Sequence, residues 1–375
     1  MDALILSCGT GGGHNAAGQA ILETLQRRGH HAVMFNPYGM KGRRLAGRID
    51  KAYLSVAKSA PHVFGAVYAL GNEIRKWPGR SPVYHVNHAL TNEMQEYLRN
   101  HPVDVVIMPH LFPAEIFTNM KCHGMEIPKT VFVATDYVCI PFTEETECDA
   151  YIVPSRELIR DFADRGIPRE KIFPLGIPTR SSFAENLSKE EAKRRLMLAL
   201  DKKYILVAGG SMGGGTIEKV IQRLMEELHR LPDTGLLVVC GSNEKLYHRF
   251  FQKQNERVRV IGFTKELWLY MKASDVFVTK PGGLSSTEAA VSRIPIVHAG
   301  AIPGCESYNE DYFTGHGMSV TFSSGEDLVQ TMEKLLYDEA AYHHMMEMQK
   351  RYVNPGAAED ICVFLEQMLS KDGKM

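Results

Sequence analysis

The chain has 375 residues, more than one hydrophobic core usually serves, so we expect two domains. Hydrophobic residues make up 44% of it and charged residues 23%, which is typical of globular proteins and excludes a disordered chain. The formal net charge of −1 argues against a nucleic-acid-binding protein, and seven scattered cysteines without a Cys-x-x-Cys pair indicate reduced thiols, not disulfides or a zinc site.

The N-terminal residues lead directly into a predicted strand and lack the basic and apolar regions of a secretory signal. No apolar run in the sequence is long enough to cross a bilayer. We therefore expect a cytoplasmic protein whose contact with a membrane, if it has one, is peripheral.

The first predicted strand, residues 3–8, is followed by a glycine-rich turn, residues 9–14, and then by a helix. A dinucleotide-binding turn would have a third glycine where His14 stands, and an acid where the next strand ends in Asn36, so an NAD enzyme is not expected. His14 begins a helix at the carboxyl end of a strand, where α/β ligand sites form. We interpret it as a catalytic residue in preference to a solvated helix-start residue.

Residues 41–80 interrupt this alternation and are strongly basic. They contain nine Lys or Arg and two acidic residues, a local charge of +7, with apolar and aromatic residues interleaved at helical spacing. This pattern is typical of an amphipathic surface that contacts anionic lipid headgroups. A helical hairpin with a solvated basic face would give the same pattern. The predicted membrane contacts are Arg43, Arg44, Arg48 and Trp77.

Three further strands are predicted at residues 103–108, 129–134 and 150–153. The first of them ends at His110 and the second at Asp136, on the side of the sheet that carries the turn with His14. Each of these polar residues is a candidate for function or for a turn cap. Asp136 joins His14 as a possible general base.

Prolines and a glycine at residues 173–178 indicate a linker between the domains. We therefore predict a first domain at residues 1–175 and a second at residues 176–354. The last predicted helix, residues 355–370, follows Asn354-Pro-Gly, and we expect it to pack back on the first domain.

The second domain contains two more strand, glycine turn and helix units, with turns at residues 209–215 and 279–288. Two helix N-termini at one edge of a sheet would bind a diphosphate through their free amides and positive dipole ends. Ser285 and Ser286 add hydroxyl donors, and Glu288 could accept hydrogen bonds from a ribose. No Asp-x-Asp pair or Walker-type loop suits a metal-bound phosphate, so no metal is expected. These features predict transfer from a nucleoside-diphosphate donor to a hydroxyl deprotonated by His14 or Asp136.

Four ordered motifs carry a family resemblance. They are Ser7-x-Gly-x-Gly-Gly-Gly-His14, Gly-Gly-Ser-Met-Gly at residues 209–213, Lys280-Pro-Gly-Gly-Leu-Ser-Ser-Thr-Glu288 and Pro303-Gly-x-Glu-x-x-Asn309. The chain resembles the monogalactosyldiacylglycerol synthases and the bacterial processive diacylglycerol glucosyltransferases. It is more remotely similar to the N-acetylglucosaminyltransferase that completes the peptidoglycan lipid precursor.

The resemblance implies an α/β GT-B fold, in which two Rossmann-like parallel-sheet domains face a central cleft. The first domain would bind the acceptor and the second the UDP-sugar. The implied reaction is an inverting, metal-independent transfer of a hexose to diacylglycerol or a glycosyl-diacylglycerol at the cytosolic membrane face. It needs no cofactor besides the UDP-sugar substrate.

The resemblance also implies roles in the donor site. It places the uracil near Gly262 and Phe263, the ribose on Glu288, the diphosphate on residues 211–213 and 282–286, and the sugar near Glu306 and Asn309. The predicted donor-site residues are Gly13, Ser211, Met212, Gly213, Gly262, Phe263, Lys280, Gly282, Gly283, Leu284, Ser285, Ser286, Glu288, Glu306 and Asn309.

Two departures from the family leave the sugar open: Cys305 stands where the family has glutamine, and Tyr308 where it has glycine. Three other functions stay possible. They are transfer of N-acetylglucosamine to a polyprenyl-linked or other lipid, epimerisation of a UDP-sugar on the same fold, and non-catalytic sensing of a nucleotide sugar.

Overall fold

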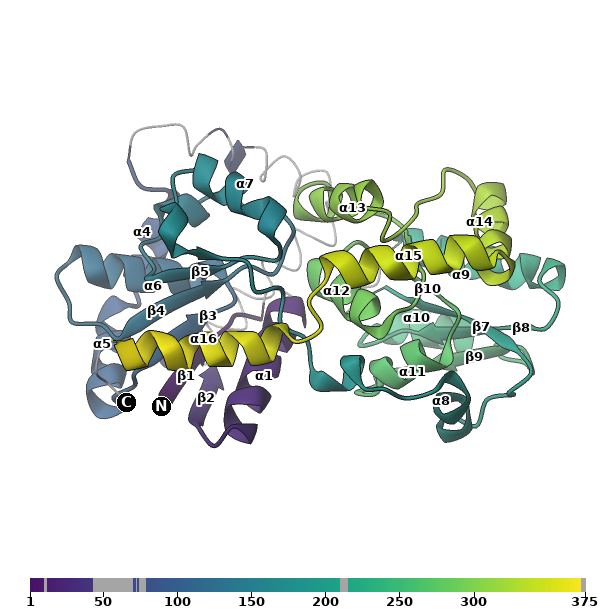
Figure 1. Ribbon diagram of the computed structural model, residues 1–375, viewed down its shortest axis with the longest axis horizontal. Coiled ribbons are helices and arrows are strands. Elements are labelled where there is room, and N and C mark those ends of the chain that lie inside the picture. The colour runs from purple at the N-terminus through teal and green to yellow at the C-terminus, as the bar shows by residue number, and fades with distance from the viewer. Residues whose placement is uncertain (10–11, 43–69, 72, 74–78, 210–214, 372–375) are drawn as a thin grey trace. The chain divides into compact units, whose positions relative to one another are not determined.

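The computed structural model describes residues 1–9, 12–42, 70–71, 73, 79–209 and 215–371. The chain divides into two compact units (Figure 1). Unit 1 comprises Met1–Arg180, Ile302–Cys305 and Asn354–Met375, and unit 2 comprises Ser181–Ala301 and Glu306–Val353. The chain therefore ends in the unit in which it begins.

Unit 1 is built on a parallel sheet of six strands in the order β2-β1-β3-β4-β5-β6. Its strands are β1 (Asp2–Leu6), β2 (His31–Phe35), β3 (Val105–Met108), β4 (Lys129–Val133), β5 (Ala150–Ile152) and β6 (Ile172–Phe173). Its helices are α1 (Gly12–Arg27), α4 (Pro82–His88), α5 (Thr91–Asn100), α6 (Leu111–Cys122), α7 (Ile159–Asp164) and α16 (Ala357–Lys371). Every residue of β3 is buried, as expected for a strand covered on both faces.

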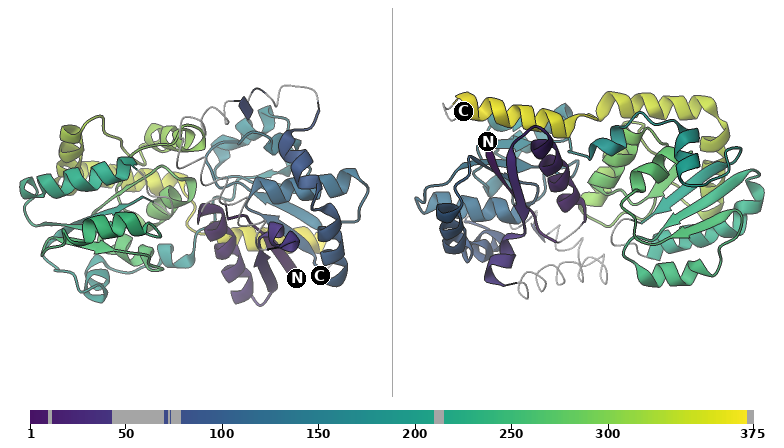
Figure 2. Two further views of the ribbon diagram at one scale, coloured as in Figure 1. Left: turned by 180° about the vertical axis from the view of Figure 1, so that it is seen from behind. Right: turned by 90° about the horizontal axis from the view of Figure 1, so that it is seen from below.

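The C-terminal helix α16 belongs to the core of unit 1. It packs beside α1 (Figure 2), and its residues Ile361, Leu365 and Leu369 share a hydrophobic cluster with Ile21 and Leu25 of α1. Alternate residues of the central strands complete that cluster, so α1 and α16 cover one face of the sheet. Helix α6 packs against β3 and β4, and α4 and α5 pack against α6.

Unit 2 is built on a second parallel sheet, of five strands in the order β11-β10-β7-β8-β9. Its strands are β7 (Lys203–Ala208), β8 (Thr234–Val239), β9 (Val258–Ile261), β10 (Val276–Thr279) and β11 (Ile296–His298). Its helices are α8 (Lys189–Arg195), α9 (Gly215–Glu227), α10 (Glu244–Phe251), α11 (Leu267–Ala273), α12 (Gly283–Ser292), α13 (Cys305–Gly315), α14 (Gly325–Tyr337) and α15 (Glu339–Tyr352). The short 3-10 helices of the two units are η1 (Pro37–Lys41), η2 (Thr143–Glu145), η3 (Arg156–Leu158), η4 (Arg169–Lys171), η5 (Ser181–Ala184) and η6 (Leu228–Arg230).

The strand orders place a topological switch point in each sheet. In unit 2, β7 comes first in the chain and lies between β10 and β8; in unit 1, β1 lies between β2 and β3. In open parallel sheets ligands bind beyond the carboxyl ends of the strands at such a point. The turns after β1 and β3 and the turns after β7 and β10 are therefore the places to look for a site. The predicted class, two parallel-sheet α/β domains, is confirmed.

Two elements depend on features that the local sequence does not reveal. Helix α8 ends at Arg195, because Met197 takes a left-handed φ of 51° and Leu198 N–H donates to the Lys193 carbonyl, a Schellman ending. Residues 173–178 were predicted as a linker, but Phe173 pairs with β5 as part of the short strand β6. A strand of two residues is too short for sequence periodicity to reveal.

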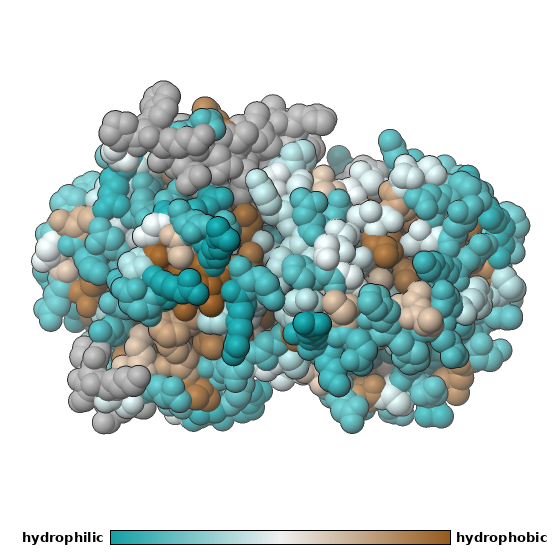
Figure 3. Space-filling model, turned by 45° about the horizontal axis from the view of Figure 1, so that its top comes forward, coloured by the Kyte–Doolittle hydropathy of each residue, from teal (hydrophilic) through white to brown (hydrophobic). Residues whose placement is uncertain are grey.

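The molecular face shown in Figure 3 carries mainly polar side chains, with apolar side chains gathered in limited patches. This is expected when the apolar residues of both sheets are buried. None of the helices in the described ranges combines the length and the apolar character needed to cross a membrane.

Candidate functional site

His14 lies in the first turn of α1, directly beyond the turn that follows β1. Its Nδ1 atom is 2.8 Å from the carbonyl oxygen of Pro109, which follows β3, and 2.8 Å from Oγ1 of Thr135, which follows β4. A carbonyl oxygen only accepts hydrogen bonds, so Nδ1 carries the proton and donates it to Pro109. The neutral ring then has its lone pair on Nε2. His14 is thus set up to accept a proton at Nε2.

The surroundings of His14 keep the ring neutral. Burial lowers the pKa of His14 below its usual value, while the negative charge of Asp136 and the hydrogen bond to Pro109 oppose this shift. Asp136 lies in the bend just after β4 and is half-buried. It is therefore near enough to stabilise a positive charge that forms on His14 when the ring takes up a proton.

His14 and Asp136 line a small pocket within unit 1, beyond the carboxyl ends of β3 and β4. Apart from Pro109, Thr135 and Thr143, the rest of the lining is apolar or aromatic. Its remaining residues are His110, Leu111, Phe132, Ala134, Val138, Ile140 and Phe162. The two polar side chains are therefore surrounded mainly by apolar groups.

His110 lines this pocket and also caps a helix. Its Nδ1 accepts a hydrogen bond from the Phe112 amide at 3.1 Å and so caps α6. Its ring meets the His14 ring edge-on, with ring centres 4.6 Å apart. Burial and the neighbouring His14 hold the pKa of His110 well below its usual range. Of its two possible roles at the end of β3, the structure thus shows the turn cap.

In unit 2, the turn after β10 leads into α12. Gly282 is the N-cap in an extended conformation and makes no side-chain capping bond, and its own amide donates to the Lys280 carbonyl at 2.8 Å. The amides of Gly283, Leu284 and Ser285 begin the helix and have no acceptor within it. Those three N–H groups and the helix dipole favour an anion at this end of α12.

Helix α13 holds this turn at two points. Asn309 is fully buried and donates from Nδ2 to the Pro281 carbonyl at 3.0 Å. Lys280 and Glu306 form an ion pair at 2.8 Å whose side chains are only 13% and 14% exposed. Such a shielded pair is held more firmly than one in water. The two residues expected near the sugar are therefore also the ones that fix the turn.

The hydroxyls of Ser285 and Ser286, at the start of α12, are engaged within unit 2. Ser285 Oγ donates to the Gly282 carbonyl at 3.2 Å, and Ser286 Oγ is fully buried and lies 2.9 Å from Nε2 of His298. Glu288 follows on the next turn of α12 and is half-buried, one turn beyond Ser285 on the same side of the helix.

The other predicted donor residues have different surroundings. Phe263 follows β9 and is 72% exposed, so its ring is open to a planar ligand, and Gly262 next to it has no atom closer than 3.8 Å to where a Cβ would lie. Gly13 is the second residue of α1. Ser211, Met212 and Gly213 lie outside the described residues, as do the predicted membrane contacts Arg43, Arg44, Arg48 and Trp77.

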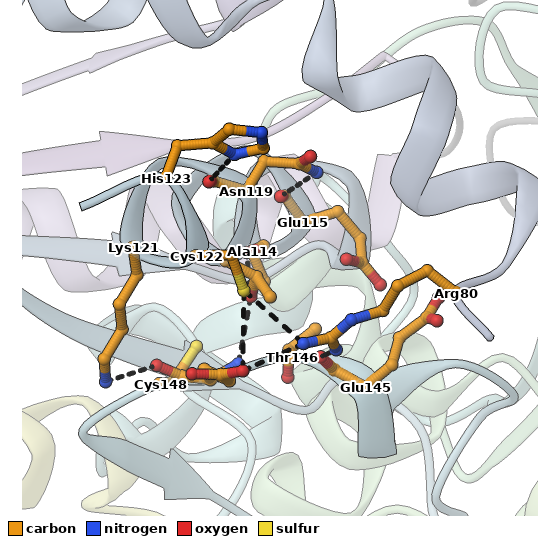
Figure 4. Close-up of polar contacts among 12 residues, drawn as sticks. Arg80, Ala114, Glu115, Asn119, Lys121, Cys122, His123, Glu145, Thr146 and Cys148 are labelled. Atoms are coloured by element: carbon orange, nitrogen blue, oxygen red, sulfur yellow. Dashed lines mark hydrogen bonds and ion pairs between the residues drawn. The ribbon is translucent and has the colours of Figure 1, made fainter. Parts of the chain in front are cut away.

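Where the basic segment ends, Arg80 is tied to unit 1 by a polar cluster (Figure 4). Arg80 forms an ion pair with Glu147 at 2.9 Å, contacts Sγ of Cys122 at 3.4 Å and donates to the Glu145 carbonyl. Glu115 points from α6 toward Arg80 and Glu145 and is fully buried. Burial and the charge of Glu145 raise the pKa of Glu115 to about 10, so its carboxyl is protonated.

Among the described residues, no group of three or more His, Cys, Asp or Glu side chains is arranged to hold a metal ion.

Comparisons with known proteins agree with this architecture. Residues 14–179 match the family model described as monogalactosyldiacylglycerol (MGDG) synthase, and residues 188–352 match the model described as glycosyl transferases group 1. The predicted family resemblance is confirmed. Among the similar curated proteins are processive diacylglycerol beta-glucosyltransferases of Bacillus cereus (strain AH187) and Bacillus mycoides (strain KBAB4). Each is 25% identical over 371 residues, covering 96% of this chain and 91% of the relative.

Similar solved structures show the GT-B fold. MurG of Acinetobacter baumannii has a TM-score of 0.62 and 13% identity, covering 98% of this chain and 99% of its own. MnaA of S. aureus in complex with UDP has a TM-score of 0.65 and 13% identity, covering 100% and 97%. The UDP-GlcNAc 2-epimerase of Neisseria meningitidis bound to UDP-GlcNAc has a TM-score of 0.64 and 12% identity, covering 98% and 100%. At these identities the likeness concerns the fold.

Sequence reasoning missed two partners of His14, the Pro109 carbonyl and the Thr135 hydroxyl. Both stand at the ends of predicted strands, next to His110 and Asp136, so the strand ends were the available signal. The tautomer of His14 is fixed by a backbone oxygen, and this contact depends on the spacing of three strands. It therefore leaves no pattern in the sequence.

Proposed function

We propose that this protein transfers a hexose from a UDP-sugar to diacylglycerol or to a glycosyl-diacylglycerol, with inversion at the anomeric carbon. The names of the relatives support the lipid acceptor and a beta product. The UDP and UDP-GlcNAc in the titles of two fold neighbours support the nucleotide. The observation that carries the proposal is the geometry of His14, whose Nδ1–H is held by the Pro109 carbonyl so that Nε2 accepts a proton.

In the proposed reaction the acceptor hydroxyl gives its proton to Nε2 of His14. Its oxygen attacks the anomeric carbon of the donor, and the bond from that carbon to the β-phosphate oxygen breaks. UDP leaves with the bonding electrons. Asp136 stabilises the positive charge formed on the ring, which makes it the partner of the base and His14 the base.

The charge that develops on the leaving diphosphate needs stabilisation from unit 2. The free amides of Gly283, Leu284 and Ser285 and the dipole of α12 supply it, with hydrogen bonds to an anion contributing roughly 1.5–3 kcal/mol each. We propose that no metal ion takes part, because the N-terminus of α12 stabilises the negative charge of the diphosphate in place of a cation. The glycine turn at residues 209–215 would add a second set of amides.

We further propose that the ribose binds Glu288 and the uracil stacks near Phe263, whose ring is exposed. The sugar would lie near Glu306 and Asn309, at the start of α13. We place the enzyme on the cytosolic face of the membrane, attached by the basic segment at residues 41–80.

A donor panel with diacylglycerol liposomes, read by mass spectrometry, tests this function. We expect one UDP-hexose to give glycosyl-diacylglycerol, and His14→Ala to reduce turnover by roughly 10²-fold while UDP binding stays unchanged. Thr24→Ser, at a buried position in the same helix, is the matched control. A nucleotide-sugar sensor would show no turnover in the wild type. An epimerase would change the UDP-sugar without an acceptor, and transfer only to a polyprenyl-linked lipid would support the N-acetylglucosamine alternative.

A further inference from the structure

His298 is a buried histidine in unit 2 that the proposed reaction does not use. It is the last residue of β11 and is 1% exposed. Its Nε2 lies 2.9 Å from Oγ of Ser286 in α12, and its Nδ1 lies 3.1 Å from Oγ of Ser319. The ring of Phe313 stands at an angle of 63° to the imidazole, with ring centres 5.6 Å apart. The three polar side chains form one chain of hydrogen bonds inside the protein.

In this chain of hydrogen bonds, the protonation state of the His298 ring is defined. Burial lowers the pKa of His298 to about 3, so the ring is neutral at any pH at which the protein would be assayed. A neutral imidazole has one donor nitrogen and one acceptor nitrogen, while each hydroxyl can both donate and accept. Both ring nitrogens are therefore satisfied whichever tautomer is present. The chain does not weaken with pH in the physiological range.

This chain of hydrogen bonds is attached to the N-terminal end of α12, next to Gly282 and Gly283. Ser286 lies on the first turn of the helix, and its amide donates to the Gly282 carbonyl at 2.9 Å. Strand β11, which carries His298, lies beside β10 in the sheet. His298 is paired in register with Thr279, the last residue of β10, and the glycine turn follows directly after Thr279. The helix start is thus tied to the sheet by a buried contact from β11, while Asn309 ties the preceding turn to α13.

We propose that His298 is a positioning residue: through Ser286, and supported by Ser319, it sets the direction in which the first amides of α12 point. Their direction determines how well they bind the diphosphate of the donor. This inference rests on the proposed function, because it assumes that a nucleoside diphosphate binds at this helix end. His298 itself is 1% exposed, so it would act through its hydrogen bond to Ser286 and not by contact with the donor.

A purely structural role would be fulfilled by any well-packed side chain. Buried hydrogen bonds also fix the orientation of the groups they join, because a hydrogen bond restricts the rotation and distance of its partners more closely than apolar packing does. The two roles therefore differ in which ligand binds more weakly when His298 is replaced. If the first amides of α12 lose their orientation, binding of the phosphates weakens and binding of the nucleoside does not change.

The test compares the dissociation constants of UDP and uridine by calorimetry. For His298→Leu we expect UDP binding weaker by roughly tenfold, the loss of about one charge-assisted hydrogen bond, with uridine binding unchanged. His298→Gln, whose amide offers one donor and one acceptor, should restore most of the UDP affinity. Ser292→Ala is the matched control, since Ser292 is a buried serine at the other end of α12 that bonds the Phe183 carbonyl.

The outcomes separate the two proposals. If the wild type binds no UDP, the proposed function fails. If the wild type binds UDP and His298→Leu binds it equally well, or loses UDP and uridine in the same ratio, the positioning role is overturned. Should His298→Leu fail to fold, Ser319→Ala decides: it removes the far end of the chain, and selective weakening of UDP relative to Ser292→Ala supports the role, while equal affinities refute it.

Discussion

At the scale of single residues, the pair of His14 and Asp136 predicts a shift in the pH dependence of activity. As the proposed base, His14 would act only when neutral, so we expect kcat/KM to fall as the pH drops through its pKa. The negative charge of Asp136 raises that pKa, and Asp136→Asn lowers it. We expect the acid limb of the kcat/KM profile to move to lower pH in Asp136→Asn.

The plateau of the same profile should also fall in Asp136→Asn, because the protonated ring loses its stabilising charge. The loss should be smaller than the roughly 10²-fold expected for His14→Ala, since the Pro109 carbonyl still holds the tautomer. Steady-state rates between pH 5 and 9 measure both effects. An unchanged acid limb would show that His14 and Asp136 do not interact in the enzyme.

Glu115 gives a second prediction at this scale, for stability. Its carboxyl is protonated in the folded protein, with a pKa of about 10, and ionises near its ordinary pKa when the chain unfolds. Its contribution to stability is thus complete below the unfolded pKa and is lost as the pH rises toward 10. Glu115→Gln keeps the neutral shape, so we expect a higher Tm near neutral pH and a flatter dependence of Tm on pH from 5 to 9.

The matched comparison for Glu115→Gln is Glu126→Gln, an exposed position beyond the same helix. Its Tm should follow the wild type at each pH. If Glu115→Gln has the same pH profile of Tm as the wild type, the buried carboxyl is ionised in the folded protein.

At the scale of elements, the attachment of α16 to unit 1 depends on a small charged network. Arg28 binds Glu359 and Glu366, at 2.7 Å to Glu366, and His30 lies 2.8 Å from Glu366. The bonds from Arg28 and His30 lower the pKa of Glu366 to about 2. The contribution of Glu366 is therefore present above its unfolded pKa and is lost as the pH falls toward 2.

We expect Glu366→Gln to lower the Tm at pH 7, and the difference from the wild type to shrink as the pH falls below about 4.5, the ordinary range of a glutamate. Calorimetric melts across this pH range measure it. Glu339→Gln, on the exposed start of α15, serves as the control. A Tm difference that does not change with pH would contradict the ionic origin of this attachment.

At the scale of the whole molecule, charge is unevenly distributed along the chain. The net charge is −1 and residues 41–80 carry +7, so the rest of the chain carries −8. A basic segment on an otherwise acidic protein favours one orientation toward an anionic surface. We expect Arg43→Glu, Arg44→Glu and Arg48→Glu together to abolish flotation with anionic liposomes and high salt to weaken the wild type in the same way.

The control for this charge reversal is the triple change Arg194→Glu, Arg195→Glu and Arg160→Glu, which alters the net charge equally at exposed sites elsewhere. It should leave flotation intact. Equal loss in both triple variants would assign the binding to overall charge and not to the basic segment.

Much of the fold could be predicted from the sequence because the strands are runs of β-branched and apolar residues buried on both faces. The parallel order followed from the alternation of strands and helices. The short strand β6 could not be predicted, since two residues show no period. The early end of α8 could not be predicted either, because it depends on one left-handed residue.

The candidate site was predictable in part for a related reason. Glycine turns and strand ends identified His14, Asp136 and the start of α12, because those positions are local in sequence. The partners that define their chemistry are distant: Pro109 is 95 residues from His14, and Ser319 is 21 residues from His298. Such contacts arise only when the sheet brings the strand ends together.

The group that orients the proposed base belongs to the peptide backbone. A carbonyl oxygen is present whichever amino acid occupies position 109, so substitutions there cannot delete it and can only displace it. If the proposed roles are right, evolution or engineering could change the residues proposed to bind the sugar in unit 2 while the Pro109 carbonyl still holds the tautomer of His14 in unit 1. The choice of donor and the basicity of the proposed base would then be separate targets for change.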